Sequence, residues 1–358
     1  MLELTWFALT ALPLIAYTVL DGFDLGVGML HHRVARTDDE RRAVLRSIGP
    51  VWDGNEVWLV VAGATLYLAF PVVFGVAFSG FYLPLTLVLW LLTFRALGIE
   101  LRHLLPHPLF SALWDASFAG ASGLLTFALG AALGNVVRGV SLDSEGQFFA
   151  PLWTSVWWPA PGVEGQVGVV DAYTALCGLS AVAVLALHGA LWLAHRVDGV
   201  VGERARADTP TLLRAAGLLV TLLTGATLYV QPNLLHNLSA RPVGLVAPLG
   251  GLGALGVLAA AIRTGRFRRA FRASAAFITA LLASAAYAIF PYVLPAREAA
   301  RGLTVHAAAN HADALVTALY WWVPGALLGA AYCVFAYRSL PAPRPDVPLA
   351  SAPTAGAD

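Results

Sequence analysis

Apolar stretches of about 20 residues, the length that a helix needs to cross a ~30 Å hydrocarbon core, recur along the whole chain. Arginine clusters or proline and glycine separate them. Within a membrane, backbone polar groups must be satisfied inside each segment, which helices achieve. The composition agrees, because 58% of the 358 residues are hydrophobic and only 12% are charged. The pattern predicts an all-α polytopic membrane protein and excludes a water-soluble domain.

The apolar segments predict about nine transmembrane helices. They lie at 5–30, 51–74, 79–100, 115–137, 168–195, 211–230, 244–262, 273–291 and 312–337. All 22 basic residues are arginine, and most fall in loops on the same side as the C-terminus. Since cytoplasmic loops carry the excess of positive charge, the N-terminus is predicted to be periplasmic. We therefore expect a transmembrane domain over 1–338 and a disordered Pro/Ala-rich cytoplasmic tail over 339–358.

Ionisable residues inside these segments are few and grouped. Asp21 and Asp24 are three residues apart, so they share a face of the first helix. Asp53 and Glu56 repeat this spacing at the start of the second segment. With the predicted orientation, all four lie toward the cytoplasmic side. A charged group in a span costs about 2.5–3.5 kcal/mol, so these residues are candidates for a path that takes up cytoplasmic protons.

Two further ionisable residues, Glu100 and the intramembrane Arg95, are expected at the inner end of the third helix, near these acids. A different interpretation applies to Asp53 and Glu56. They could complement the positive N-terminus of the second helix, whose start Asn55 helps to shape. Capping one helix does not explain buried acids on another, so a functional role for the group is favoured.

Glycine and histidine have plainer interpretations. Gly22, Gly26 and Gly28 match the small-residue spacing that lets membrane helices approach closely. His188 lies near the middle of its span, where a hydrogen bond to a neighbouring helix is expected rather than a ligand role. No histidine pair at i, i+4 faces a common site, so haem or metal binding by this chain is not expected.

Two aspartates precede or begin apolar segments. Asp115 and Asp171 are expected to cap the fourth and fifth helices or to complement their positive N-termini.

Three long motifs occur in order along the first part of the chain: DGFDLGVG at 21–28, IGPVWDGNEVWL at 48–59 and AFSGFY at 77–82. With these motifs, the chain resembles subunit II of the cytochrome bd-type quinol oxidases. Weaker similarities extend the resemblance over essentially the whole sequence.

The resemblance implies a nine-helix fold of two four-helix bundles plus one peripheral helix. It also implies a heterodimer in the bacterial cell (cytoplasmic) membrane. The haem-bearing subunit I of that complex holds two b-type haems and haem d, and quinol is the substrate. The complex is electrogenic and couples quinol oxidation to the reduction of dioxygen to water. The resemblance leaves open the quinone used and the presence of a small accessory subunit.

Residue roles follow from the same resemblance. Asp53 corresponds to an acid at the mouth of a proton path, and Trp58 to a residue near a dioxygen route at the subunit interface. Trp52 and Asn55 belong to the same motif and are expected to be structural, as is Arg95. The expected proton path comprises Asp53, Glu56, Asp21, Asp24 and Glu100, and no catalytic residue or metal ligand is expected in this chain.

Two alternatives remain from the sequence. One is a cyanide-insensitive relative in which a b-type haem replaces haem d. The other, in a different class, is a proton-coupled secondary transporter that uses Asp21, Asp24 and Asp53 as cation sites at broken helices.

Overall fold

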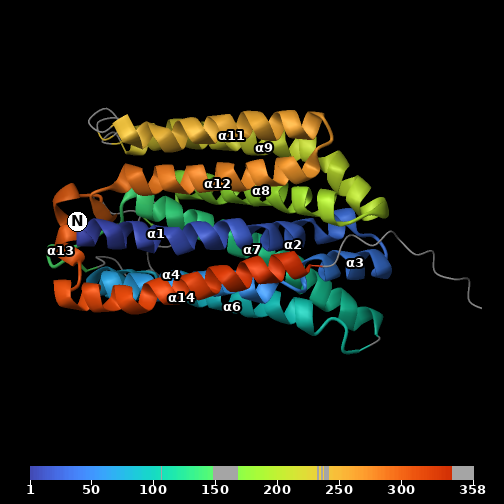
Figure 1. The fold of residues 1–358 in the computed structure, drawn as a ribbon, viewed down its shortest axis with the longest axis horizontal. Coiled ribbons are helices and arrows are strands. Elements are labelled where there is room, and N and C mark those ends of the chain that lie inside the picture. Colours follow the sequence, from blue (N-terminus) through green and yellow to red (C-terminus); the bar gives the residue numbers. More distant parts are fainter. Residues whose placement is uncertain (106, 148–167, 232–233, 235–236, 238–241, 341–358) are drawn as a thin grey trace, which may run out of the picture.

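The computed structural model describes residues 1–105, 107–147, 168–231, 234, 237 and 242–340. These residues form a bundle of long helices that run along one common axis (Figure 1). Of the tail predicted over 339–358, Ser339 still belongs to the last helix, and the part beyond Leu340 lies outside the described residues.

Helices account for almost all of the described secondary structure. The long ones are α1 (Leu2–Leu20), α2 (Gly22–Val34), α4 (Trp52–Ala69), α6 (Tyr82–Glu100), α7 (Pro108–Arg138), α8 (Ala172–Arg196), α9 (Gly199–Val230), α11 (Val246–Arg263), α12 (Phe267–Ile289) and α14 (Ala312–Ser339). The shorter elements are α3 (Asp38–Ile48), α5 (Pro71–Gly80), α13 (Val305–Ala308), two 3₁₀ turns at Pro242–Leu245 and Ala299–Arg301, and the strands β1 (Tyr292–Leu294) and β2 (Leu303–Thr304), which pair antiparallel.

Eight helical segments of the described chain are long and apolar enough to cross a membrane, counting α1 and α2 as one segment of 33 residues. The remaining predicted segment, 51–74, corresponds to α4, whose first turns carry polar residues. It ends at Ala69 rather than at 74, because Pro71 cannot continue the hydrogen-bonding pattern of α4 and instead begins α5. The junction between α5 and α6 is at Phe81, so α6 begins three residues after the start of the predicted segment 79–100.

The long helices form the two predicted four-helix groups. One contains α1 with α2, α4, α6 and α7, and the other contains α8, α9, α11 and α12 (Figure 1). The ninth long segment, α14, lies along α4 at the periphery, and only Leu315 and Ala318 of its residues are buried.

The two groups meet where α2 and α7 pack against α8. A Cβ atom at Gly26 would overlap the carbonyl oxygen of Leu185 and the backbone of Gly189, so glycine permits this close approach. Nearby, the ring of Phe23 stacks on Trp192 with centroids 4.1 Å apart. The core between the groups is therefore closely packed around the first turns of α2.

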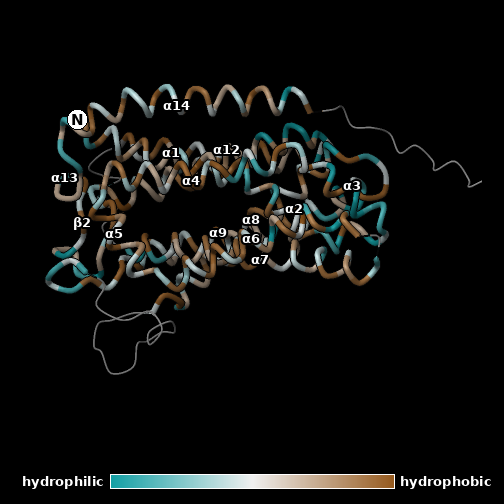
Figure 2. Tube along the Cα trace, turned by 90° about the horizontal axis from the view of Figure 1, so that it is seen from below, coloured by the Kyte–Doolittle hydropathy of each residue, from teal (hydrophilic) through white to brown (hydrophobic). Residues whose placement is uncertain are grey.

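Hydrophilic residues gather at the two ends of the bundle (Figure 2). The N-terminus, α13 and β2 lie at one end, and α3 lies at the other. The loop between α11 and α12 and the start of α9 share the α3 end (Figure 1), which we call the arginine-rich end. Arginine-bearing loops on one side are what the predicted orientation requires.

Candidate functional site

A buried ion pair joins α6 to the junction of α1 and α2. Arg95 and Asp21 both have fully buried side chains. The guanidinium Nη1 and Nη2 donate to Oδ2 and Oδ1 of Asp21, each at 2.6 Å. Two parallel charge-assisted hydrogen bonds fix the relative orientation of both groups. The pair therefore ties α6 to the point where α1 passes into α2.

Glu56 on α4 extends this pair toward the surface. Its Oε2 accepts a hydrogen bond of 3.0 Å from Arg95 Nη2, and its side chain is 23% exposed. One cation thus faces two carboxylates, of which one is closed to water and the other is partly open. Because arginine stays protonated in proteins, it can hold these carboxylates in place but cannot pass a proton on.

Asp24 belongs to a second polar chain. Asn55 Nδ2 donates to Asp24 Oδ2 at 2.7 Å, and the Tyr337 hydroxyl donates to Asn55 Oδ1 at 2.9 Å. The other carboxylate oxygen of Asp24 is buried and has no hydrogen-bond partner in the described chain. This chain of three side chains connects α2 through α4 to the peripheral α14.

Two more contacts join α4 and α14. Trp58 Nε1 lies 3.4 Å from Cys333 Sγ, and Trp322 Nε1 donates to Thr65 Oγ1 at 2.9 Å. Together with the hydrogen bond from Tyr337 to Asn55, they join successively later residues of α4 to successively earlier residues of α14, so the two helices run antiparallel. We call these three contacts the α4–α14 seam.

The structure brings together most, but not all, of the residues expected at the proton path. Asp21, Asp24 and Glu56 gather around Arg95 and Asn55. Asp53 and Glu100 do not join them. Both are exposed, and neither forms a hydrogen bond or ion pair within the part of the chain that the structure describes.

The motif tryptophan and glycines lie in packed positions. Trp52 is 8% exposed and belongs to the core that includes α2 and α8. A Cβ at Gly22 would come within 2.9 Å of the Leu185 side chain, and one at Gly28 would overlap Ser122.

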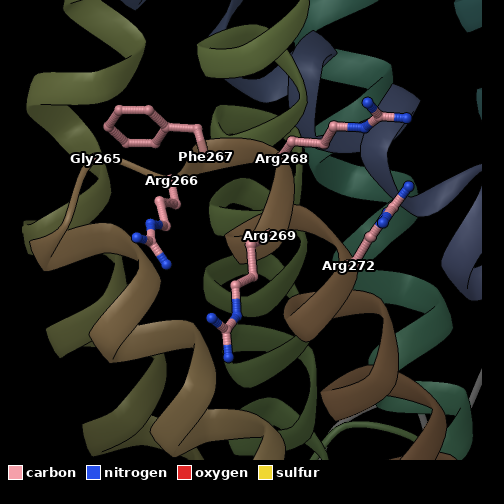
Figure 3. Close-up of a pocket in the computed structure, with 6 residues that line it drawn as sticks. All are labelled: Gly265, Arg266, Phe267, Arg268, Arg269 and Arg272. Atoms are coloured by element: carbon pink, nitrogen blue, oxygen red, sulfur yellow. The ribbon is translucent and has the colours of Figure 1, made fainter.

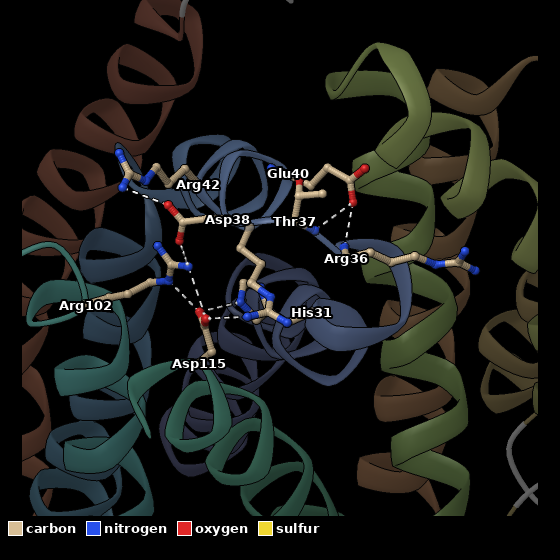
Figure 4. A network of polar contacts seen from close by, with 9 residues as sticks. His31, Arg36, Thr37, Asp38, Glu40, Arg42, Arg102 and Asp115 are labelled. Carbon is tan, nitrogen blue, oxygen red and sulfur yellow. Dashed lines mark hydrogen bonds and ion pairs between the residues drawn. The ribbon is translucent and has the colours of Figure 1, made fainter. Parts of the chain in front are cut away.

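A second buried network, centred on Asp115, was missed by the sequence interpretation (Figure 4). Asp115 accepts hydrogen bonds from Arg102 Nε at 2.5 Å, His31 Nε2 at 2.8 Å and Arg41 Nη1 at 3.2 Å. Its predicted role at a helix N-terminus is wrong, because α7 already begins at Pro108. Proline in the first turn of a helix was the signal that could have placed this start correctly.

The network reaches the surface at α3. Arg102 Nη2 donates to Asp38 Oδ1 at 2.7 Å, and Arg42 pairs with the other oxygen of Asp38 at 2.7 Å. The hydrogen bond from Arg102 lowers the pKa of Asp38 below its ordinary value. This network anchors α3 to the ends of α6 and α7.

Asp171 has the role that the sequence predicted. It is the N-cap of α8, where its side chain accepts from the backbone N–H of Thr174 and the Thr174 hydroxyl accepts from the N–H of Asp171. Arg138 forms an ion pair with the same carboxylate.

His188 is engaged on both sides of its ring. Nε2 lies 3.0 Å from the Val19 carbonyl oxygen of α1, and Nδ1 lies 2.6 Å from the Ser274 hydroxyl of α12. The hydrogen bonds to neighbouring helices agree with the prediction. Among the described residues, no three His, Cys, Asp or Glu side chains are grouped as a metal site requires.

A family model for cytochrome bd terminal oxidase subunit II matches residues 2–340, which is nearly the whole chain. The chain belongs to this family. Its relatives include the probable cytochrome oxidase subunit 2 of Haemophilus influenzae, 28% identical over 95% of this chain and 94% of the relative. The cytochrome bd-I ubiquinol oxidase subunit 2 of Escherichia coli K12 is 29% identical over 93% of each chain.

A chain of the bd oxidase from Geobacillus thermodenitrificans has the same fold, with a TM-score of 0.74 over 94% of this chain and 98% of that one, at 18% identity. As a member of the cytochrome bd subunit II family, the chain is a multi-pass protein of the bacterial inner membrane and part of a quinol oxidase complex. The comparisons do not support the alternative of a secondary transporter.

Proposed function

We propose that this chain is the subunit of a quinol:oxygen oxidoreductase that supports the haem-bearing subunit I and supplies the cytoplasmic entrance of its proton path. The observation that carries the proposal is the pair of acids on α4. Asp53 is exposed, and Glu56, one turn further along, is 23% exposed and is held in place by the buried Arg95. The name of the Escherichia coli relative supports quinol as the electron donor.

In the proposed complex, subunit I holds two b-type haems and haem d. His188, which lies near mid-span in this chain, does not fit the role of an axial ligand, since both ring nitrogens already have hydrogen-bond partners. We therefore derive no step that passes through a haem held by this subunit.

The contacts of the acids divide them into two groups. Asp21 is locked by two hydrogen bonds to Arg95, so its function is to neutralise a buried cation. Asp53 has no such partner among the described residues, and Glu56 remains partly open to solvent. Protons from the cytoplasm bind first at the Asp53 carboxylate and pass to Glu56 along α4, toward the proposed contact with subunit I. Trp58, on the same helix, lies at the proposed dioxygen route.

Replacement of Asp53 by Asn in the complex co-purified with subunit I tests this role. We expect quinol-dependent oxygen consumption to fall about 100-fold, the lower end of what a positioned proton-transfer group contributes. Reduced-minus-oxidised spectra should show unchanged haem content, because Asp53 is not packed in the core. Asp39→Asn is the matched control, since Asp39 is also exposed at the arginine-rich end.

Equal turnover in the Asp53→Asn and Asp39→Asn complexes would remove Asp53 from the path. Glu56→Gln separates the two acids further. A loss of turnover in Glu56→Gln alone would place the entrance at Glu56 instead.

A further inference from the structure

A hollow at the arginine-rich end lies outside the site described above. It is lined by residues 265–269 and 272, in the loop between α11 and α12 and the first turns of α12 (Figure 3). Its volume is about 670 Å³, and it is open to the surroundings. Four of its lining residues are arginines: Arg266, Arg268, Arg269 and Arg272.

The charge of these four arginines is not balanced locally. None of them forms an ion pair with an acid in the described part of the chain, and all four are exposed. Other arginines at the same end differ, since Arg33 pairs with Asp208 and Arg204 pairs with Glu40. The hollow is therefore a concentrated positive site that lacks a counter-ion from the described residues.

The side chains extend in two pairs. In Figure 3, Arg266 and Arg269 extend to the same side of the α12 start, while Arg268 and Arg272 extend together in another direction. Spacings of three and four residues place such pairs on common faces of a helix. Arg268 and Arg272 are also close enough to His195 of α8 to interact with it electrostatically. Each pair presents donors suited to the oxygens of a phosphate group.

Exposed apolar surface continues from the hollow along α11. Leu252 is 66% exposed and Val257 is 39% exposed, both on the helix that ends at the hollow. A ligand with a phosphate head and hydrocarbon chains could use both surfaces at once. A soluble anion would use only the arginines. Basic pockets at the cytoplasmic ends of membrane helices bind anionic headgroups by this combination.

We propose that the hollow formed by Arg266, Arg268, Arg269 and Arg272 binds the headgroup of an anionic phospholipid. The phosphate lies between the guanidinium groups of Arg266 and Arg269, Arg268 and Arg272 add positive charge nearby, and the acyl chains lie along the exposed face of α11. Phe267, which also lines the hollow, is partly buried against the core, and its ring centroid lies 5.9 Å from the guanidinium carbon of Arg206.

Native mass spectrometry of the purified complex tests the proposal by counting bound lipids. The complex is titrated in detergent with dioleoylphosphatidylglycerol or, as the zwitterionic comparison, dioleoylphosphatidylcholine. The test variant is Arg266→Gln/Arg269→Gln, and the control is Arg36→Gln/Arg46→Gln, which removes the same charge from exposed sites on and before α3. A basic residue near a membrane surface contributes about fivefold to anionic-lipid affinity, so two account for about 30-fold.

The expected result is preferential retention of phosphatidylglycerol by the wild type and the control, with about 30-fold weaker retention by the test variant. Equal retention in test and control variants would overturn the proposal. Release of the lipid by millimolar sodium phosphate would also overturn it, in favour of a site for soluble anions. If the double variant does not assemble, as judged by its haem spectrum, the single variant Arg269→Gln gives the same test with an expected change of about fivefold.

Discussion

Removal of the Arg95 guanidinium should destabilise the chain more than any change to its surface charges. In Arg95→Gln, the Asp21 carboxylate stays fully buried and loses both of its 2.6 Å hydrogen bonds. Loss of one member of a buried ion pair costs about 3–5 kcal/mol, because an unpaired charge is left in a poorly solvated site. The unfolding equilibrium should therefore shift about 150-fold to 5,000-fold.

The double variant Asp21→Asn/Arg95→Gln separates this cause from a general loss of packing. With both charges removed, no buried carboxylate is left at position 21, and most of the lost stability should return. Glu56 also loses its partner, but its side chain is 23% exposed and can be solvated, at a cost of about 0–1 kcal/mol.

Titration of the purified complex with SDS, followed by tryptophan fluorescence, measures the change. Arg42→Gln serves as the control, since Arg42 and Asp38 form an i,i+4 pair whose side chains are 60% and 50% exposed. That variant should lose only about 0.3–0.5 kcal/mol. The reasoning is refuted if Arg95→Gln loses no more stability than Arg42→Gln. It is also refuted if the double variant loses as much stability as the single variants Arg95→Gln and Asp21→Asn together.

Two further outcomes are expected. Gly26→Ala should lower the stability by about 1–3 kcal/mol, because its Cβ would overlap the backbone of Gly189. Gly63→Ala is the control and should leave the thermal midpoint unchanged, because a Cβ there meets no atom within 4 Å. Equal midpoints for the two variants would refute the close-packing argument. Arg102 lowers the folded-state pKa of Asp38, so the pair stabilises the protein above the unfolded pKa of about 3.9, and this contribution is lost as pH falls through the folded pKa. Between pH 6 and pH 3, the thermal midpoint should therefore fall less for Asp38→Asn than for the wild type. The difference corresponds to under about 1 kcal/mol, because the Asp38 carboxylate is half exposed. Parallel curves for the two proteins would contradict this prediction.

Much of the fold was predictable because one physical requirement controls it. Each span must be apolar and long enough for the hydrocarbon core, and sequence length and composition report this directly. The same signal is weak for α4, where Asp53, Asn55 and Glu56 lower the apolar character of the first turns. The interruption after Ala69 also left the predicted end of that segment wrong.

The candidate site was predictable as a set of residues but not as a set of contacts. Asp21 and Arg95 were recognised because a charge in a span is costly, yet nothing in the sequence specifies that they share two hydrogen bonds. Asp53 and Glu56 are one turn apart, and only tertiary packing places one on the surface and the other against Arg95. The Asp115 network was missed because Arg102 and His31 lie on segments far apart in sequence.

The α4–α14 seam determines how the peripheral helix is held in a lipid environment. Apolar side chains of α14 exchange contacts with lipid tails at little cost, so they do not prevent the helix from rotating or sliding. The hydrogen bonds at Asn55, Trp58 and Thr65 behave differently, because lipid tails offer no replacement donor or acceptor. A shift of α14 by one residue would break all three together. The seam therefore sets the register of α14 on α4.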